Sequence, residues 1–574
     1  MPWGLVPGPF GLYLPNNAGT FLQPDRGRHE SAHSRRSLMK KRAFLALTAV
    51  AAVGLTACGA PADPTGGGGS AEEVEPGYLA VADPDFAAGG ELTVQVDYDV
   101  DEVGGLDPQA ASAARGWMVE GLVYETLTTI DENLEVQPGL AASWEQPSDT
   151  EYVFQLDTDA TFSNGRDMTV DDVAGSLQRL VDTPTTWTGQ LGPISSVEAT
   201  GDEEVTVTLA EPYTPFLAAL ANTPAAVLPM QEIDAGDIDV ATEMLGTGPL
   251  VVAEHRQDEY WTFEPNEHHQ AADELGFSGL RLEVVSDEST RVAALRDGSA
   301  DLAMLNSVDS ADALADASDV AVVNQQNTDF HYLIMNSIAG DEALQDEDVR
   351  FAINTAIDRD AINELVLGGT SQSTGVTPAT LPDACVAEDL PSAQAAVEDA
   401  KAVIDDLGGL ELNLVVYDSE AVLSDIAQVI QQNLAEIGVT VSIESYDYAT
   451  YSSLVYADPS DFDLALSWFS GYADPSMVTT WWNPSLAGFT SVYNVGSDET
   501  SALIADAAQT PAGAERADLF SDLCASVDEE SETVPLVLRP TEIGYRTDGL
   551  SPTLFADEGY GNVLRAITEY RAAE

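Results

Sequence analysis

The sequence predicts an α/β protein of two or three domains, and three observations support this. Residues 412–417 form a β-rich run, and apolar side chains then recur at helical spacing over residues 423–437. Gly438 ends that helix and residues 439–443 return as a strand, which makes a β-α-β crossover with a parallel strand pair. Residues 288–305 repeat the order of helix, glycine turn and strand. With 574 residues, 44% of them apolar, the chain is long enough for more than one core.

The segment formed by residues 39–57 and Cys58 is similar to the signal of a bacterial lipoprotein. Three basic residues at 40–42 precede a largely apolar run at 43–55, which is too short to cross a bilayer as a permanent helix. The ending Leu-Thr-Ala-Cys resembles the site at which the cysteine receives lipid before cleavage. The resemblance implies that Cys58 becomes the first residue and attaches the protein to the outer face of the cell membrane. An uncleaved anchor or a buried apolar helix is the alternative.

Residues 1–38 precede a methionine from which such a signal can start. They are rich in Pro, Gly, Arg and Ser and show no sustained apolar period. We therefore interpret them as an upstream extension without a fold of its own. Residues 58–90 include Pro61, Pro64, the glycine run 66–69 and the adjacent glutamates 72–73, a composition typical of a flexible tether between the lipid and the folded part.

The net charge excludes several classes of partner. Seven of the 22 basic and two of the 97 acidic residues precede Cys58, so the chain from Cys58 onward carries 15 basic and 95 acidic residues and a net charge of −80. This charge repels nucleic-acid phosphates and anionic membrane surfaces. We expect neutral or cationic solutes and a protein as partners, and no nucleic acid.

A series of motifs runs in order through the chain. They comprise Gly-Leu-Asp-Pro at 105–108, Leu-Val-Tyr-Glu-Thr-Leu at 122–127, Pro-Gly-Leu-Ala-Ala-Ser-Trp at 138–144, Phe-Ser-Asn-Gly with the following helix start at 162–173, and Leu-Gly-Thr-Gly-Pro at 245–249. In the fourth of these, Thr169 and Asp172 form an acidic variant of the capping box, which predicts the start of a helix. The order and spacing of the motifs resemble the family 5 solute-binding proteins of ABC importers, the group of dipeptide, oligopeptide and nickel receptors. The resemblance implies a two-lobed α/β fold of the periplasmic-binding-protein type, in the cluster of large peptide-binding receptors, with a hinge between the lobes.

The resemblance also implies how the chain is divided between the lobes. We expect residues 91–326 to form lobe I with a subdomain, residues 327–533 to form lobe II, and residues 534–574 to return to lobe I. The polar segment 324–329, between two apolar runs, is the expected first crossing. The block Val534-Pro535-Leu536 resembles the second crossing.

Cys385 and Cys524 are the two cysteines that follow Cys58. An even pair in an exported chain favours a disulfide between them. Two buried free thiols are the alternative.

The sequence signals no enzyme and no cofactor. The chain after Cys58 has four histidines and contains no Gly-x-Ser-x-Gly elbow, no His-Glu-x-x-His motif and no phosphate-binding loop. Adjacent His268 and His269, near Glu264 and Glu267, invite a metal interpretation, but neighbouring side chains diverge in helix and strand, and no third His or Cys lies nearby in the sequence. We expect no metal site. A secreted hydrolase or an adhesin is the alternative to a receptor.

The loop that follows the predicted strand 461–468 is the expected ligand contact, because ligands bind at the carboxyl ends of strands in open α/β sheets. In the peptide receptors that this chain resembles, an aspartate three residues after the loop tryptophan takes the ligand's amino terminus, and here that position is Gly471. Asp474 is the nearest carboxylate, although it could instead cap a helix begun by Pro475. The candidate ligand-binding residues are Tyr98, Trp468, Phe469, Ser470, Gly471, Tyr472, Asp474 and Trp481.

The function that this resemblance implies is that of a monomeric receptor. It would bind short peptides between its lobes and deliver them to the ABC permease subunits in the membrane. A sugar, a siderophore or a nickel complex is the alternative cargo.

Overall fold

The computed structural model describes residues 77–100, 105–110, 114–183, 185, 187–484, 490–556 and 559–574. These residues belong to one compact unit that spans Val74–Glu574. The expected upstream extension, the signal at residues 39–57 and the lipidated Cys58 lie outside the described residues. In the part that is described, no helix combines the length and the apolar character needed to cross a membrane.

The end of the expected tether is folded, which corrects that prediction. Strand β1 (Tyr78–Ala80) pairs antiparallel with β21 (Leu554–Phe555). The backbone N–H groups of Gly89 and Gly90 donate to the carbonyl oxygen of Ala572. The polar, glycine-containing composition indicated a free segment, but its N–H and C=O groups find partners in the C-terminal segment, more than 460 residues away along the chain.

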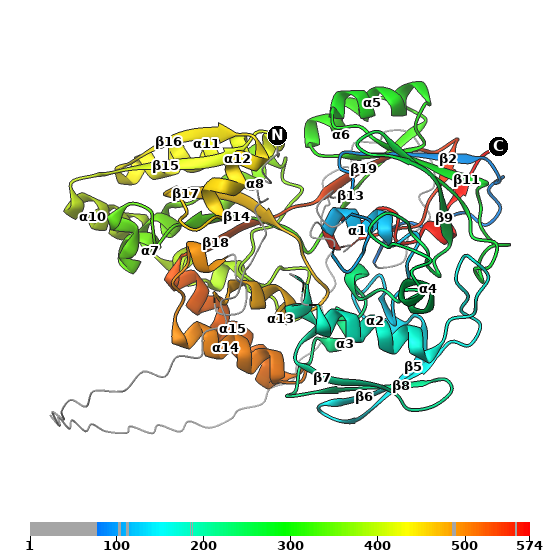
Figure 1. Ribbon diagram of the computed structural model, residues 1–574. Helices are drawn as coiled ribbons and strands as arrows, with labels where there is room; N and C mark the ends of the chain where they lie inside the picture. The colour runs from blue at the N-terminus through cyan, green and yellow to red at the C-terminus, as the bar shows by residue number, and fades with distance from the viewer. Residues whose placement is uncertain are drawn as a thin grey trace, which may run out of the picture. The chain divides into compact units, whose positions relative to one another are not determined.

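The fold is two-lobed and α/β, as predicted, with one large sheet in each lobe (Figure 1). The sheet of lobe I has seven strands. Strand β2 runs parallel to β11 and β12, and β19 runs antiparallel to β12 and β13. In sheet order the strands are β13 (Val320–Gln325), β19 (Thr541–Arg546), β12 (Leu302–Leu305), β2 (Glu91–Val96), β11 (Gly279–Val284), β10 (Tyr260–Pro265) and β9 (Leu250–Arg256).

Helices α5 (Glu288–Asp297) and α6 (Val308–Leu314) lie along the sheet of lobe I (Figure 1). The side chain of Asp287 caps the start of α5 by accepting the N–H of Thr290. Gly298 ends the helix with a φ of 79°, a conformation that glycine adopts without strain. The predicted order of helix, glycine turn and strand over residues 288–305 is therefore confirmed.

The sheet of lobe II contains the predicted β-α-β crossover. Strand β15 runs parallel to β16 with Leu410 opposite Val439, and α11 connects them and ends at Gly438 in the left-handed conformation. In sheet order the strands are β16 (Val439–Tyr446), β15 (Leu410–Tyr417), β17 (Leu464–Phe469), β14 (Phe330–Met335) and β18 (Thr533–Leu538). The main helices of this lobe are α7 (Glu347–Ala356), α8 (Arg359–Val366), α10 (Val397–Leu407), α11 (Ala421–Ile437), α12 (Tyr448–Val455), α14 (Asp498–Gln509) and α15 (Ala514–Glu530).

A disulfide joins Cys385 to Cys524 in α15, with the Cα atoms 5.7 Å apart. Both cysteines are buried. The pairing that the sequence favoured is therefore present. It ties the irregular segment before α10 to the helix that leads into β18.

The chain crosses between the lobes twice. The first crossing joins β13 to β14 through residues 326–329, inside the predicted polar segment. The second comes later than predicted, because β18 still pairs with β14 in the sheet of lobe II and only β19 lies in lobe I. The resemblance of Val534-Pro535-Leu536 to the family's second crossing placed the crossing at a proline. Pro535 is instead tolerated at the edge of the sheet, where the register shifts between His331 and Tyr332.

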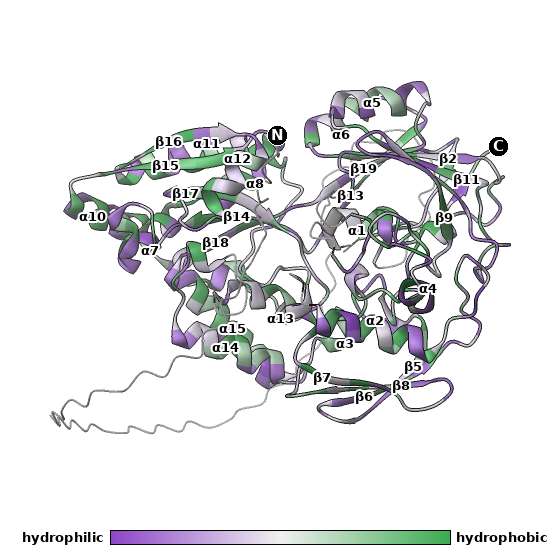
Figure 2. Ribbon diagram, in the orientation of Figure 1, coloured by the Kyte–Doolittle hydropathy of each residue, from purple (hydrophilic) through white to green (hydrophobic). Residues whose placement is uncertain are grey.

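A four-stranded antiparallel sheet and helix α2 (Val170–Asp182) form the expected subdomain of lobe I (Figure 2). The two central strands, β6 and β8, alternate buried apolar and outward polar residues, which directs one face toward α2. In sheet order they are β5 (Ala141–Ser148), β6 (Glu151–Leu156), β8 (Glu204–Leu209) and β7 (Ile194–Ala199).

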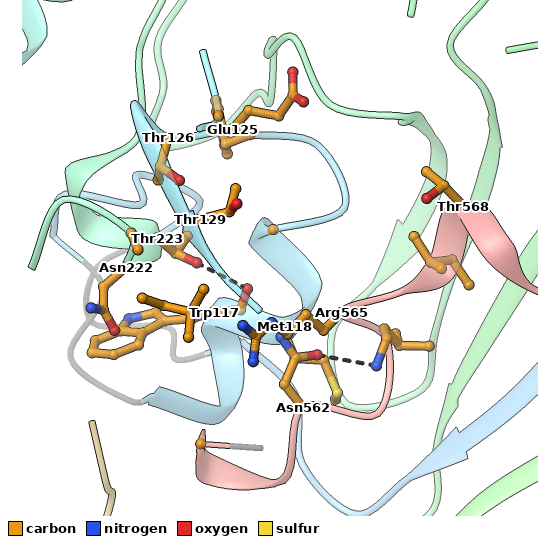
Figure 3. A pocket seen from close by; sticks show the side chains of 18 of the residues that line it. Trp117, Met118, Glu125, Thr126, Thr129, Asn222, Thr223, Asn562, Arg565 and Thr568 are labelled. Atoms are coloured by element: carbon orange, nitrogen blue, oxygen red, sulfur yellow. Dashed lines mark hydrogen bonds between the residues drawn. The ribbon is translucent and has the colours of Figure 1, made fainter. Parts of the chain in front are cut away.

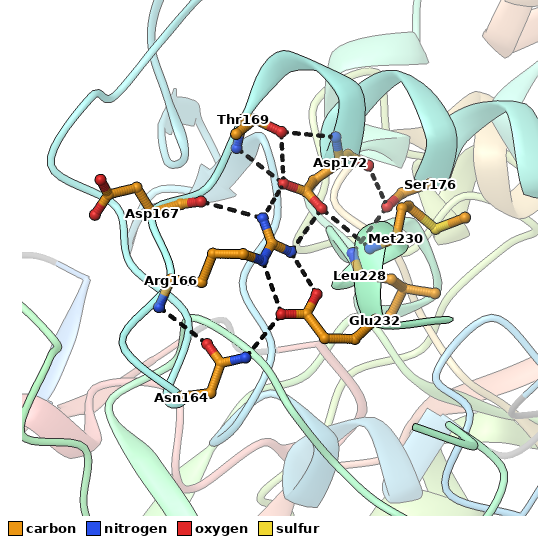
Figure 4. A network of polar contacts seen from close by, with 9 residues as sticks. All are labelled: Asn164, Arg166, Asp167, Thr169, Asp172, Ser176, Leu228, Met230 and Glu232. Carbon is orange, nitrogen blue, oxygen red and sulfur yellow. Dashed lines mark hydrogen bonds and ion pairs between the residues drawn. The ribbon is translucent and has the colours of Figure 1, made fainter. Parts of the chain in front are cut away.

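An arginine network fixes the start of α2 (Figure 4). Thr169 and Asp172 form the predicted capping box, in which each side chain accepts the other's backbone N–H. The guanidinium of Arg166 donates to both oxygens of Asp172 at 2.8 Å and pairs with Glu232 in α4 (Met230–Ala235) at 2.7 Å. The hydrogen bond from Arg166 lowers the pKa of Glu232. The motif that carries part of the family resemblance is thus a helix-capping device.

Candidate functional site

A cavity of about 610 Å³ is lined by residues of both lobes (Figure 3). This volume lies within the range of small-molecule sites. Lobe I contributes helix α1 (Ala114–Glu120), the chain up to β4 (Val136–Pro138), the turn after β10 and the C-terminal segment 559–568. Lobe II contributes the loop after β17.

Only part of the predicted site lines this cavity. Among the eight candidates, Gly471 and Tyr472 are lining residues, together with Ala473 beside them. The predicted loop of lobe II thus contributes to the lining. The prediction did not locate the lobe I side of the cavity, which supplies most of the lining.

The aromatic candidates are mainly core residues. Phe469 packs against Phe330 and Trp482, with ring centroids 5.5 and 5.1 Å away. The guanidinium of Arg539 lies 4.3 Å from the ring centroid of Trp468, and the ring of Trp481 meets that of Phe469 edge-on.

The two other candidates outside the lining lie at different depths. Tyr98 is 41% exposed and follows the end of β2, and Ser470 is half-buried.

Gly471 approaches the first crossing so closely that no side chain fits there. A Cβ atom at this position would lie 1.9 Å from Oγ1 of Thr328 and 2.3 Å from its carbonyl carbon. The N–H of Gly471 donates to Oδ1 of the buried Asp329 at 2.8 Å, and the N–H of Tyr560 donates to the same oxygen at 3.0 Å. The loop of lobe II is therefore joined through one carboxylate to the C-terminal segment of lobe I.

Asp474, the predicted ligand anchor, does not line the cavity, and its side chain has other partners. It caps α13 (Pro475–Thr479) by accepting the N–H of Ser476 at 2.8 Å. Both of its oxygens also accept hydrogen bonds from Nη2 of Arg516 at 2.8 Å. Arg516 lies in α15, 42 positions along the chain, so the sequence could not indicate this ion pair. The alternative interpretation of Asp474, as a helix cap, describes the structure.

Aromatic residues of both lobes meet at the cavity. Trp117 of α1 lines it and contacts Tyr560 edge-on, with ring centroids 5.7 Å apart. Trp117 also packs edge-on against Trp187, which in turn packs 5.5 Å from Tyr472 of the lobe II loop. Burial raises the pKa of Tyr472, so its hydroxyl stays protonated at neutral pH. One side of the cavity is therefore an uncharged aromatic wall.

Glu125, His269 and Arg565 are lining residues that the site prediction missed. Nε2 of His269 lies 3.5 Å from Oε1 of Glu125. Nη2 of Arg565 donates to the carbonyl oxygen of Asp131 at 3.2 Å. Glu125 belongs to one of the motifs that carry the family resemblance, but that motif gives no sign that its side chain faces a cavity.

The two adjacent histidines point to different places. His268 lies beside Gly165, where a Cβ atom would be 3.2 Å from the imidazole ring, whereas His269 faces Glu125. Among the described residues, no group of three or more His, Cys, Asp and Glu side chains is arranged to hold a metal ion.

A two-lobed α/β fold with a cavity lined from both lobes defines a class of solute-binding protein. The family model of the bacterial extracellular solute-binding proteins, family 5 (middle part), matches residues 135–489. The chain belongs to this family, as the sequence motifs indicated.

Individual relatives are distant. The chain is 26% identical over 432 residues to a probable D,D-dipeptide-binding periplasmic protein of Escherichia coli K12, which covers 71% of this chain and 80% of the relative. It is 24% identical over 468 residues to the nickel-binding periplasmic protein of the same organism, covering 76% and 87%.

The structure is similar to that of a periplasmic binding protein of Helicobacter pylori solved with the peptide STSA. The TM-score is 0.73 at 21% identity, with 85% of this chain and 99% of the other covered. At this identity the likeness supports the fold alone. The curated relatives are named as binding proteins and not as enzymes.

Proposed function

We propose that this protein is an extracytoplasmic, lipid-anchored receptor of an ABC importer that binds short peptides between its lobes. The observation that carries the proposal is the cavity of about 610 Å³ lined by both lobes. A ligand that contacts both sides binds the closed arrangement better than an open one, so it shifts the population toward closure. The closed receptor is then the form that the permease recognises. The protein itself performs no chemistry on its cargo.

Lipid anchoring rests on the sequence of residues 39–57 and Cys58. The chain after Cys58 carries a net charge of −80, so a basic surface does not hold it to an anionic membrane. A covalent lipid supplies that attachment in the proposal. We propose a monomer, because each chain contributes both lobes to its own cavity.

Short peptides are the favoured cargo for two reasons. The family includes relatives named as peptide-binding and glutathione-binding. The cavity also combines an aromatic wall with hydroxyl, amide, carboxylate and guanidinium side chains, which suits a ligand with amide groups and both apolar and charged ends.

Native mass spectrometry of the protein purified from its own cells tests the proposal. We expect a co-purified peptide, and thermal-shift measurements with peptide libraries should then give a higher unfolding temperature than without ligand. A co-purified sugar or siderophore, without any peptide response, would remove peptides as the cargo. Turnover of the released ligand by the purified protein would overturn the receptor role.

A nickel complex is the second candidate, because a relative is named as nickel-binding and His269 lines the cavity. One histidine cannot saturate a nickel ion, so a nickel cargo would have to bring its own ligands. Equilibrium dialysis with nickel alone and with nickel plus free histidine separates the cases. Stoichiometric tight nickel that is lost when both His268 and His269 are replaced would overturn the peptide proposal.

A further inference from the structure

Glu125 presents a carboxylate to the cavity from a rigid backbone. Its carbonyl oxygen accepts the N–H of Val227 at 3.0 Å, and the carbonyl oxygen of the next residue, Thr126, accepts the N–H of Leu140 at 2.9 Å. Two neighbouring segments therefore hold the turn between α1 and β3 (Thr128–Ile130) in place. The side chain of Glu125 is 31% exposed, and the residue lines the cavity.

His269 orients this carboxylate. The backbone N–H of Ala271 donates to Nδ1 of His269 at 3.1 Å, so Nδ1 is an acceptor and carries no proton. The ring proton therefore resides on Nε2, which faces Oε1 of Glu125 at 3.5 Å. The ring is held in a turn in which the N–H of His269 donates to the carbonyl oxygen of Asn266, and its side chain is only 8% exposed. His269 is thus held with Nε2 toward one carboxylate oxygen of Glu125.

The second oxygen of Glu125 is left for a ligand. Within the described part of the chain, no arginine or lysine forms an ion pair with Glu125. The cavity's arginine, Arg565, is turned to the carbonyl oxygen of Asp131 and lies over the ring of Phe555. Figure 3 shows the Glu125 carboxylate well apart from the guanidinium of Arg565. The two charges therefore form separate poles of the cavity.

A ligand that closes the cavity removes water from Glu125. A desolvated carboxylate with one free oxygen is costly unless a cation or a strong donor pairs with it. The lobe II loop offers no competing carboxylate, since Gly471 has no room for a side chain and Asp474 is held by Arg516. Of these carboxylates, that of Glu125 is therefore the one that a cation of the ligand would stabilise.

We propose that Glu125, oriented by His269, binds a cationic nitrogen of the cargo, an ammonium or amidinium group. This inference rests on the proposed function and deepens it, because it selects solutes with a basic nitrogen over neutral sugars. Glu125 contacts the ligand directly. His269 is a positioning residue that acts through Glu125.

The test compares two probe sets on the full-length protein by isothermal titration calorimetry. The sets are alanine-based di- to pentapeptides and the same peptides with an acetylated amino terminus. We expect wild type to prefer the free amine. Glu125→Gln should weaken binding of the free-amine set by about 10- to 100-fold, the range of one charge-assisted hydrogen bond, and should leave the acetylated set nearly unchanged. Equal weakening of both sets would indicate a general packing defect and would overturn the specific role.

Two further variants sharpen the result. Glu135→Gln removes the same charge from an exposed residue outside the cavity lining, where solvent screens it, and should change binding less than about 3-fold. His269→Gln retains an N–H donor toward Glu125 and should keep the preference for the free amine, whereas His269→Leu should lose it. If His269→Leu keeps the full preference for the free amine, His269 does not act as a positioning residue.

The possible failures are distinguishable. If wild type binds peptides but Glu125→Gln binds them equally well, the inference is wrong and the receptor proposal stands. If wild type binds neither probe set, peptides are excluded and the co-purified solute decides. A solute without a basic nitrogen overturns the inference, and one with a basic nitrogen is titrated against wild type and Glu125→Gln in the same way.

Discussion

Gly471→Ala should destabilise both the fold and the binding site. The new Cβ atom would lie 1.9 Å from Oγ1 of Thr328 and 2.3 Å from its backbone carbon, far inside contact distance. The hydroxyl can rotate away, but the backbone of the crossing cannot. The loop must therefore shift, and the hydrogen bond from the N–H of Gly471 to Asp329 is weakened or lost.

The expected loss follows from two terms. Overpacking a buried site costs about 1–3 kcal/mol. A hydrogen bond to a buried carboxylate contributes about 1.5–3 kcal/mol. A shift of the loop relieves the overpacking but weakens the hydrogen bond to Asp329, so the two costs do not simply add. We expect a total loss of about 2–4 kcal/mol in the free energy of unfolding. Gly471→Asp, which restores the carboxylate of the peptide receptors, should cost at least as much because its side chain is larger.

Urea unfolding measures the free energy, and calorimetry with the co-purified ligand measures affinity. Gly189→Ala is the matched control, because no atom lies within 4 Å of the Cβ position there and the glycine has no positive φ. The control should change stability by less than about 0.5 kcal/mol. If Gly471→Ala and Gly189→Ala are equally stable and bind equally well, the close approach is not a constraint and the reasoning is refuted.

Three further predictions concern the anchor, the disulfide and acid stability. Cys58→Ser should release the protein from membranes and leave ligand affinity unchanged; a variant that stays in the membrane fraction after a high-salt wash would contradict the anchor. Replacing Cys385 and Cys524 together by serine should cost about 2–5 kcal/mol in urea unfolding, given a separation of 139 residues, and two free thiols in non-reducing mass spectrometry of wild type would contradict the bond. Burial, and next the charge of Arg539, lower the pKa of His331 to about 3, so the unfolded chain binds a proton between about pH 6.5 and 3 that the folded chain does not. The free energy of unfolding should therefore fall with decreasing pH by up to about 1.4 kcal/mol per pH unit in that window. His331→Gln should remove this part of the pH dependence, and an unchanged pH dependence in the variant would contradict the prediction.

The sequence predicted those parts of the fold that local patterns determine. The crossover in lobe II follows from apolar spacing and a glycine at the helix end, and Gly438 adopts the left-handed conformation that this requires. The capping box at Thr169 follows from a polar pair three residues apart. The end of the tether and the second crossing were misplaced because long-range pairing decides both. Tyr78–Ala80 finds a partner strand near the C-terminus, and Pro535 fits a register shift at a sheet edge.

The site was less predictable than the fold, because its lining comes from segments that are distant in sequence. Trp117 and Glu125 belong to one stretch, His269 and Arg565 to two others, and nothing local to any of the three indicates a shared cavity. Conversely, Asp474 had the chemistry expected of an anchor, but an arginine 42 residues away neutralises it. Residue type suggests what a side chain could bind. Its partners in the fold decide what it does bind.

Asp329 connects the cavity to the crossing between the lobes. Its Oδ1 accepts N–H groups from Gly471 in lobe II and from Tyr560 in lobe I, and both donors line the cavity. Its own carbonyl oxygen accepts the N–H of Arg539, which lies in the second crossing. A change in the angle between the lobes would alter these distances, because the donors belong to different lobes and the acceptor to the crossing itself. Ligand contacts with Tyr560 and with the backbone at Gly471 would therefore favour the lobe angle in which both hydrogen bonds to Asp329 are intact. In the proposed receptor, the backbone at Gly471 makes the connection to the crossing. The charge proposed to select the ligand resides on Glu125 in the opposite lobe.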